Sequence, residues 1–121
     1  MRFMVLFKAT KDSEAGKMPT AKQLALMDAF NGELEKAGIV VVDGAGLVPS
    51  SKGTRIKFSG DKTTIVDGPF AETKEIVGGY CLIEAKSHDE AVACMRRGPF
   101  GEVEEGAEIE IRRLFGPEDF A

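Results

Sequence analysis

Apolar residues fill both faces of the strand that residues 2–8 predict. Successive side chains of a strand point to opposite faces. Along this segment the two sets alternate, with Phe3, Val5 and Phe7 on one face and Met4 and Leu6 on the other. Residues 78–85 repeat the pattern. The helices of a small domain can cover one face of a sheet. The second apolar face needs another cover, so the pattern predicts a partner subunit.

Two other segments have the apolar spacing of helices. The first begins with Thr20 and Gln23, which form a capping-box pattern, and ends at Gly38. Its apolar stripe consists of Leu24, Met27, Phe30 and Leu34. The second begins with a capping-box pattern at Ser87 and Glu90, and it stops at Gly98-Pro99.

The remaining apolar segments predict strands of different kinds. Residues 39–42 are a short β-branched run, which favours a buried strand. Residues 54–58 and 63–66 flank a turn sequence, Ser59-Gly60-Asp61-Lys62, and predict a hairpin. Residues 108–115 alternate charged and apolar side chains, as a half-buried last strand does. We expect polar loops over residues 11–18 and 100–106.

The order of these elements is strand, helix, strand, hairpin, strand, helix, strand. Two crossovers through helices are typical of the split βαβ arrangement. The sequence therefore predicts an α+β protein with a ferredoxin-like βαββαβ fold and an inserted β-hairpin. The length of 121 residues suits a single domain over residues 1–121.

Composition narrows the class of protein. The chain has 16 basic and 20 acidic residues and a net charge of −4, whereas nucleic-acid-binding domains are usually basic. No apolar run approaches the roughly 18 residues of a membrane-spanning helix. Cys81 and Cys94 lie in apolar patterns and are expected to be free thiols. We expect a cytoplasmic protein that binds neither nucleic acid nor membrane.

Several motifs give no support to a cofactor or a metal. Gly44-Ala45-Gly46 begins like a dinucleotide-binding fingerprint, but the third glycine is missing and a hairpin follows instead of a helix. A strand-exit turn is the better interpretation. His88 is the only histidine, and its place at the start of a helix favours an exposed side chain. One histidine and two separated cysteines lack metal-ligand spacing, so neither cofactor nor metal is expected.

The densest chemistry lies in residues 67–75, Asp67-Gly68-Pro69-Phe70-Ala71-Glu72-Thr73-Lys74-Glu75, followed by Gly78-Gly79-Tyr80. Asp67 is the strongest candidate, and two interpretations of it stay open. Its carboxylate can lie in an apolar pocket, with its pKa raised by burial or lowered by Lys74. Alternatively, it accepts backbone N–H bonds from the turn that it opens. Phe70 and Tyr80 can be pocket walls or core aromatics.

The Asp67–Phe70 tetrapeptide resembles the signature of the DGPF branch of the YCII-related family. The similarity extends along nearly the whole chain, through FMVLF, LEKAG, GLVPSSKG, VDGPFAETKE, IVGGY, EIEIR and EDF. The resemblance implies a ferredoxin-like fold that pairs sheet to sheet as a dimeric α+β barrel. The broader superfamily includes muconolactone isomerase-like enzymes, polyketide cyclases and small monooxygenases. Related proteins use a His–Asp pair. By analogy Asp67 corresponds to the aspartate of that pair, and no histidine of this chain occupies a matching strand position. The chain also departs from the branch at Ala45, often glutamate, and at Val48, histidine in some members.

Two functional hypotheses follow. The first is a homodimer whose apolar pocket binds an unknown small organic molecule and transforms it by cofactor-free acid–base chemistry of the isomerase, cyclase or lyase type. Asp67 would be the acid or base, Lys74 its partner, and Phe70 and Tyr80 the walls. The second is a non-catalytic sensor or interaction module. Proteins of the branch often accompany extracytoplasmic-function sigma factors, which implies a regulatory role.

Overall fold

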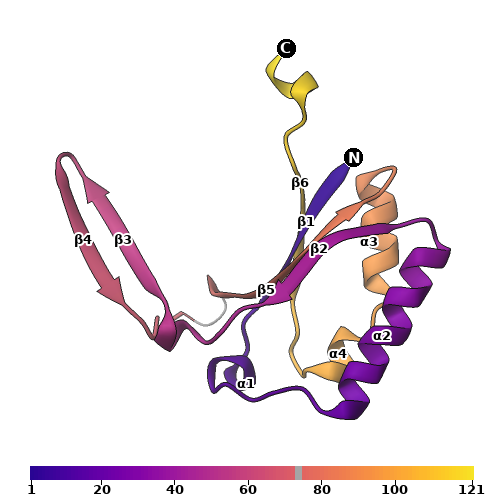
Figure 1. Cartoon of the computed structure of the whole chain (residues 1–121), viewed down its shortest axis with the longest axis horizontal. Coiled ribbons are helices and arrows are strands. Elements are labelled where there is room, and N and C mark those ends of the chain that lie inside the picture. The colour runs from indigo at the N-terminus through magenta and orange to yellow at the C-terminus, as the bar shows by residue number, and fades with distance from the viewer. Residues whose placement is uncertain (73–74) are drawn as a thin grey trace.

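The computed structural model describes residues 1–72 and 75–121 (Figure 1). Its strands are β1 (Arg2–Lys8), β2 (Val40–Gly46), β3 (Thr54–Ser59), β4 (Lys62–Asp67), β5 (Val77–Glu84) and β6 (Ile109–Arg113). Its α-helices are α1 (Lys11–Glu14), α2 (Ala21–Lys36), α3 (His88–Arg96) and α4 (Phe100–Val103), with 3-10 turns over Ser50–Lys52 and Pro117–Phe120. The predicted order of elements is confirmed.

Four strands form an antiparallel sheet in the order β2-β5-β1-β6. β1 lies inside the sheet, where Val5 pairs with Cys81 on one side and with Ile111 on the other. β5 separates β1 from β2, so the connection through α2 is a split βαβ unit. The α+β, ferredoxin-like fold expected from the sequence is confirmed.

The core lies on one face of this sheet. Phe3, Val5 and Ile83 are fully buried there. They pack against residues of the two long helices, Phe30 and Leu34 of α2 and Ala91, Cys94 and Met95 of α3. Each large side chain buried in this way contributes about 1.5–3 kcal/mol. Within the described residues, Met4 and Leu6 are not part of this core and stay half-buried on the opposite face, as the alternation predicts.

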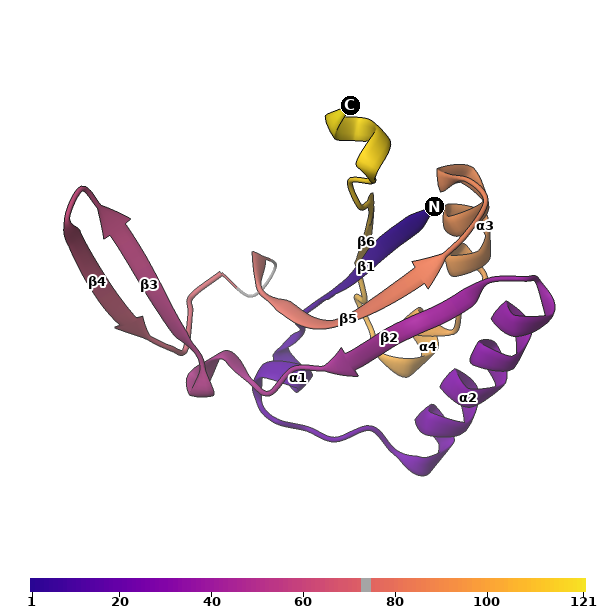
Figure 2. The ribbon, with the colours of Figure 1, turned by 45° about the horizontal axis from the view of Figure 1, so that its top comes forward.

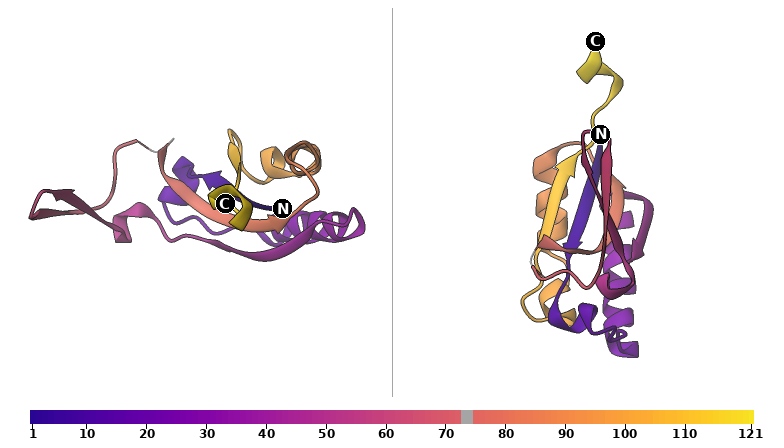
Figure 3. Two further views of the ribbon diagram at one scale, coloured as in Figure 1. Left: turned by 90° about the horizontal axis from the view of Figure 1, so that it is seen from above. Right: turned by 90° about the vertical axis from the view of Figure 1, so that its left-hand side faces the viewer.

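Strands β3 and β4 form a separate two-stranded sheet. Figures 1 and 2 show it projecting from the body on the side away from α2 and α3, and the views in Figure 3 agree. We call residues 54–67 the arm. The predicted hairpin is confirmed, with Ser59 paired to Lys62 at its tip.

Three local predictions were wrong. Residues 39–42 do not form a buried strand: only Ile39 is buried, and β2 runs on to Gly46. β2 lies at the sheet edge, so Val40 is 52% exposed. The two expected loops contain the short helices α1 and α4. Thr10 caps the start of α1, and its hydroxyl accepts a hydrogen bond from the Ser13 amide.

Beyond β6 the chain leaves the sheet as a short tail (Figure 3). Arg113 donates two hydrogen bonds to the Asp119 carboxylate, of 2.8 and 3.0 Å, and so holds the final turn. Both cysteines are free, Cys81 half-buried and Cys94 buried. In residues 1–72 and 75–121, no helix has the length and apolar character needed to cross a membrane.

Candidate functional site

A cavity of about 490 Å³ lies between α2 and the sheet. Much of its wall is apolar and comes from α2, α4 and the start of β6, including Leu24, Met27, Phe30, Phe100 and Ile109. Phe100 packs its ring against Phe30, with ring centres 5.4 Å apart. Leu24 belongs to the predicted apolar stripe but is 55% exposed, because it stands at this cavity instead of in the core.

Small residues form the sheet side of the cavity, at the end of β2 and the start of β5: Gly44, Ala45, Gly46, Gly78 and Gly79. The strands come close at these positions. A Cβ atom on Gly79 would lie 3.1 Å from the Ala45 carbonyl oxygen, and one on Gly44 would lie 3.1 Å from the Tyr80 carbonyl oxygen. Glycine therefore lets the strands pair here, and it also leaves space where side chains would otherwise stand.

Asp43 and Tyr80 form a polar pair among the cavity residues. The Tyr80 hydroxyl donates a hydrogen bond of 3.0 Å to the Asp43 carboxylate. This bond, and then the negative charge of Asp43, raises the pKa of Tyr80. Burial raises the pKa of the neighbouring Cys81 thiol, and the charge of Asp43 adds to the effect. Both groups therefore hold their protons more tightly than they would in water.

Asp43 lies at the boundary between the two faces of the sheet. Cys81 pairs with Val5 and therefore lies on the helix-covered face, whereas Tyr80 pairs with Leu6 on the open face. The register of β2 shifts between Val41 and Asp43. A bulge of this kind re-aims a side chain on an edge strand. From this position the Asp43 carboxylate raises the pKa of Tyr80 on the open face and that of Cys81 on the helix-covered face.

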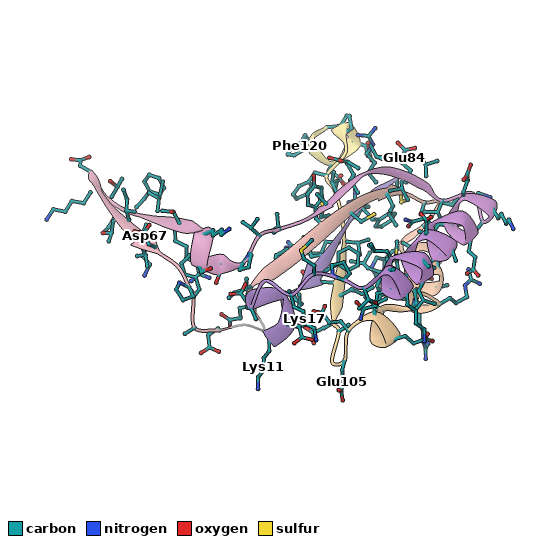
Figure 4. The ribbon with its side chains drawn as sticks, turned by 60° about the horizontal axis from the view of Figure 1, so that its bottom comes forward. Lys11, Lys17, Asp67, Glu84, Glu105 and Phe120 are labelled. Atoms are coloured by element: carbon teal, nitrogen blue, oxygen red, sulfur yellow. The ribbon has the colours of Figure 1, made fainter. Side chains whose placement is uncertain are left out.

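The residues predicted from the sequence are divided between two places. Tyr80 is among the cavity residues, and its side chain lies on the open face of the sheet. Asp67 ends β4 on the exposed arm, as Figure 4 shows, and its carboxylate accepts a 3.2 Å hydrogen bond from the Thr54 hydroxyl. Phe70 is half-buried at the base of the arm, with the Arg55 guanidinium carbon 3.8 Å from its ring centre. Lys74 lies outside the described residues. The catalytic roles of Asp67 and Lys74 stay predictions.

A hydrogen-bonded cluster at the base of the arm was missed by the sequence reasoning. The buried Ser50 donates its backbone N–H to Glu14 at 3.0 Å, and its hydroxyl also donates to that carboxylate. The amide of Phe70 donates to the Ser50 hydroxyl oxygen at 3.1 Å. A Cβ atom on Gly68 would lie 1.7 Å from the Ser50 carbonyl oxygen, so the motif requires glycine there. The cluster joins α1, the turn at Ser50–Lys52 and the DGPF segment.

Among residues 1–72 and 75–121, no three histidine, cysteine, aspartate or glutamate side chains gather closely enough to hold a metal ion.

Comparison with known proteins gives three findings. The chain is 46% identical over 48 residues to the uncharacterized protein R00369 of Rhizobium meliloti (strain 1021), a match that spans 40% of this chain and 39% of that protein. It is 18% identical to the solved structure of 5-chloro-2-hydroxyhydroquinone dehydrochlorinase (TftG) from Burkholderia phenoliruptrix AC1100 in complex with 2,5-dihydroxybenzoquinone, with a TM-score of 0.49 over 98% of each chain. The family model of the YCII-related domain matches residues 1–115. The chain therefore belongs to the YCII-related family, as the DGPF segment predicted.

Proposed function

We propose that the protein is a cytoplasmic homodimer that binds a small organic molecule in the cavity between α2 and the sheet and transforms it by cofactor-free acid–base chemistry. A volume of about 490 Å³ lies within the range of small-molecule sites. Apolar walls with a few convergent polar groups are the usual composition of such sites. The substrate is accordingly a compact, largely apolar molecule with at least one polar group.

Asp43 is the observation that carries this proposal, because it stands among the cavity residues at the bulge of β2 and its charge reaches the Cys81 thiol on the helix-covered face. Its carboxylate is a base that can take a proton from a bound molecule. Tyr80 lies on the open face, stays protonated and donates its hydrogen bond to Asp43, which holds the carboxylate in place. The protonated Asp43 can return the proton at a second position of the same molecule, so an isomerisation or cyclisation balances without a redox partner.

The open face of the sheet supports pairing as a dimeric α+β barrel. Met4, Leu6 and Leu82 share this face by strand alternation. Ion pairs of balanced sign flank them, Arg2 with Glu84 at 3.1 Å and Lys8 with Glu110 at 3.3 Å. An apolar centre with both signs of charge at its border can meet its own copy across a two-fold axis.

A second candidate is a non-catalytic sensor or protein-interaction module linked to sigma-factor regulation. The observation in its favour is the cluster of Glu14, Ser50 and Phe70, which uses the DGPF segment as a structural clasp. If catalysis takes place at the arm and not at the cavity, Asp67 and Lys74 would supply the acid–base pair.

An NMR titration distinguishes these functions. A panel of small phenols, enones and lactones is added, and backbone amide shifts are followed. We expect saturable shifts in Gly44–Gly46 and Gly78–Cys81 with none in the arm, and we expect Asp43→Asn to weaken binding or remove turnover without changing the melting temperature. Shifts confined to Asp67 and its neighbours would transfer the site to the arm. No saturable shift with any member of the panel would favour the non-catalytic module.

A further inference from the structure

We propose that the arm packs its apolar face on a second copy of this chain. Strand pairing puts Ile56 opposite Ile65 and Phe58 opposite Thr63 on one face of the arm. The three apolar side chains there are 55% (Ile56), 77% (Phe58) and 67% (Ile65) exposed. The other face is mainly polar and basic, with Arg55, Lys57, Lys62 and Thr64 beside the single apolar residue Val66.

Contacts within the arm do not bury this apolar face. Within the described part of the chain, β3 and β4 pair only with each other, in a sheet of two strands. An isolated two-stranded hairpin is marginally stable in water. The exposed parts of the three side chains amount to about 350 Å², the size of a patch that is often functional on a monomer. Such a surface on a projecting ribbon indicates that a cover is contributed from outside the chain.

Charge favours a copy of the same chain as that cover. The arm, residues 54–67, holds three basic residues, Arg55, Lys57 and Lys62, against two acidic ones, Asp61 and Asp67. Thirteen basic and eighteen acidic residues remain in the rest of the chain. The arm is thus positive by one charge and the remainder negative by five. An arm laid on the body of a second copy meets the opposite charge, whereas nucleic acid would be repelled by that body.

The area is sufficient for a stable pair. Two symmetry-related arms, each covering a surface as large as its own apolar face, would bury about 1,400 Å² in total, which lies within the range of specific dimers. This contact is additional to the sheet-face pairing in the proposed function, and it does not depend on whether the cavity is catalytic.

The test compares neighbouring residues on opposite faces of β4. Ile65→Asp puts a charge into the proposed contact, while Thr64→Asp puts the same charge on the basic face and is the matched control. Sedimentation equilibrium gives the dimer dissociation constant of each variant. We expect Ile65→Asp to raise it about thirtyfold or more, and Thr64→Asp to leave it within about threefold. Since both positions are exposed, circular dichroism should show an unchanged fold.

A third variant separates the arm from the sheet face. Leu82→Asp changes the open sheet face and should also weaken the dimer. A dimer that is weakened by Leu82→Asp but not by Ile65→Asp overturns the arm contact and leaves the sheet-face dimer intact. A wild type that is monomeric at micromolar concentration overturns both contacts. The NMR titration of the cavity on the same samples reports the proposed function separately.

Discussion

Replacing Gly68 by alanine tests whether the motif glycine holds the base of the arm. A Cβ atom there would lie 1.7 Å from the carbonyl oxygen of Ser50 and 2.6 Å from its carbonyl carbon. Real Cβ atoms essentially never come closer than 3.0 Å to another heavy atom. The backbone at Ser50 or at Gly68 must therefore move, and both positions belong to the hydrogen-bonded cluster.

The cost follows from the bonds that this movement disturbs. The Gly53 amide donates to the Ser50 carbonyl oxygen at 2.8 Å, and the Phe70 amide donates to the Ser50 hydroxyl oxygen at 3.1 Å. Each such bond contributes about 1 kcal/mol net, and forcing an atom into a filled space costs about 1–3 kcal/mol. We expect Gly68→Ala to destabilise the base of the arm by about 3–5 kcal/mol.

Hydrogen exchange and urea unfolding measure this loss together. Because the arm is attached to the body through its base, the loss should appear first as faster exchange of the Gly53 and Phe70 amides, which open locally. Gly32→Ala in α2 is the control, since a Cβ atom there meets nothing within 4 Å and alanine favours a helix by about 0.5–1 kcal/mol. Wild-type protection of the Phe70 amide in Gly68→Ala would refute the assignment of a structural role to this glycine.

Three further predictions concern ionisation and the motif acid. Tyr80 is the only tyrosine, so tyrosinate absorbance should report its pKa directly, above 10.0 in the wild type and lower in Asp43→Asn. Because the folded pKa is raised, the contribution of Tyr80 to folding stability is present below pH 10.0 and is lost as the pH rises through the folded pKa. The pKa of Asp119 is lowered from 3.8 to about 2, first by its hydrogen bonds with Arg113 and then by the bond from the Gly116 amide. Its contribution to stability should be present above pH 3.8 and be lost as the pH falls towards 2. NMR of the Arg113→Met variant should find the carboxyl pKa raised from the wild-type value, but still below 3.8 because the Gly116 bond remains. Asp67→Asn should keep an acceptor oxygen and cost little stability in a thermal melt, and a large fall in melting temperature with ligand binding unchanged would assign Asp67 to the scaffold.

Much of the fold could be predicted because its signals are local. Thr20 and Gln23 stand three residues apart, and both bonds of their capping box form, at 3.2 and 2.8 Å. At Ser87 the hydroxyl oxygen accepts from the Glu90 amide, which is one of the two bonds of the capping box expected there. The alternation in β1 likewise depends only on neighbouring positions. Such patterns need no knowledge of what lies across the fold.

The errors at β2 and at the site come from contacts between distant segments. The β-branched residues Val40–Val42 are typical of a strand, but the chain order alone does not say that β2 stands at the edge of the sheet. Asp43 and Tyr80 are 37 positions apart, and they meet because β2 pairs with β5 in one register. Ser50 and Glu14 are 36 positions apart. Nothing in the sequence near either member indicates its partner.

The same argument explains why the sequence predicted a site in the DGPF segment and not at the cavity. A segment rich in glycine, proline and charge marks a place where the backbone is tightly constrained, and Gly68 against Ser50 is such a place. Chemistry needs the opposite condition, a polar group beside space that side chains do not fill. The glycines at the end of β2 and the start of β5 provide that space, and Asp43 is the acid that the bulge in β2 brings to it. A sequence search for acids beside paired glycine-containing strand ends would therefore find Asp43, which a search for unusual loops does not.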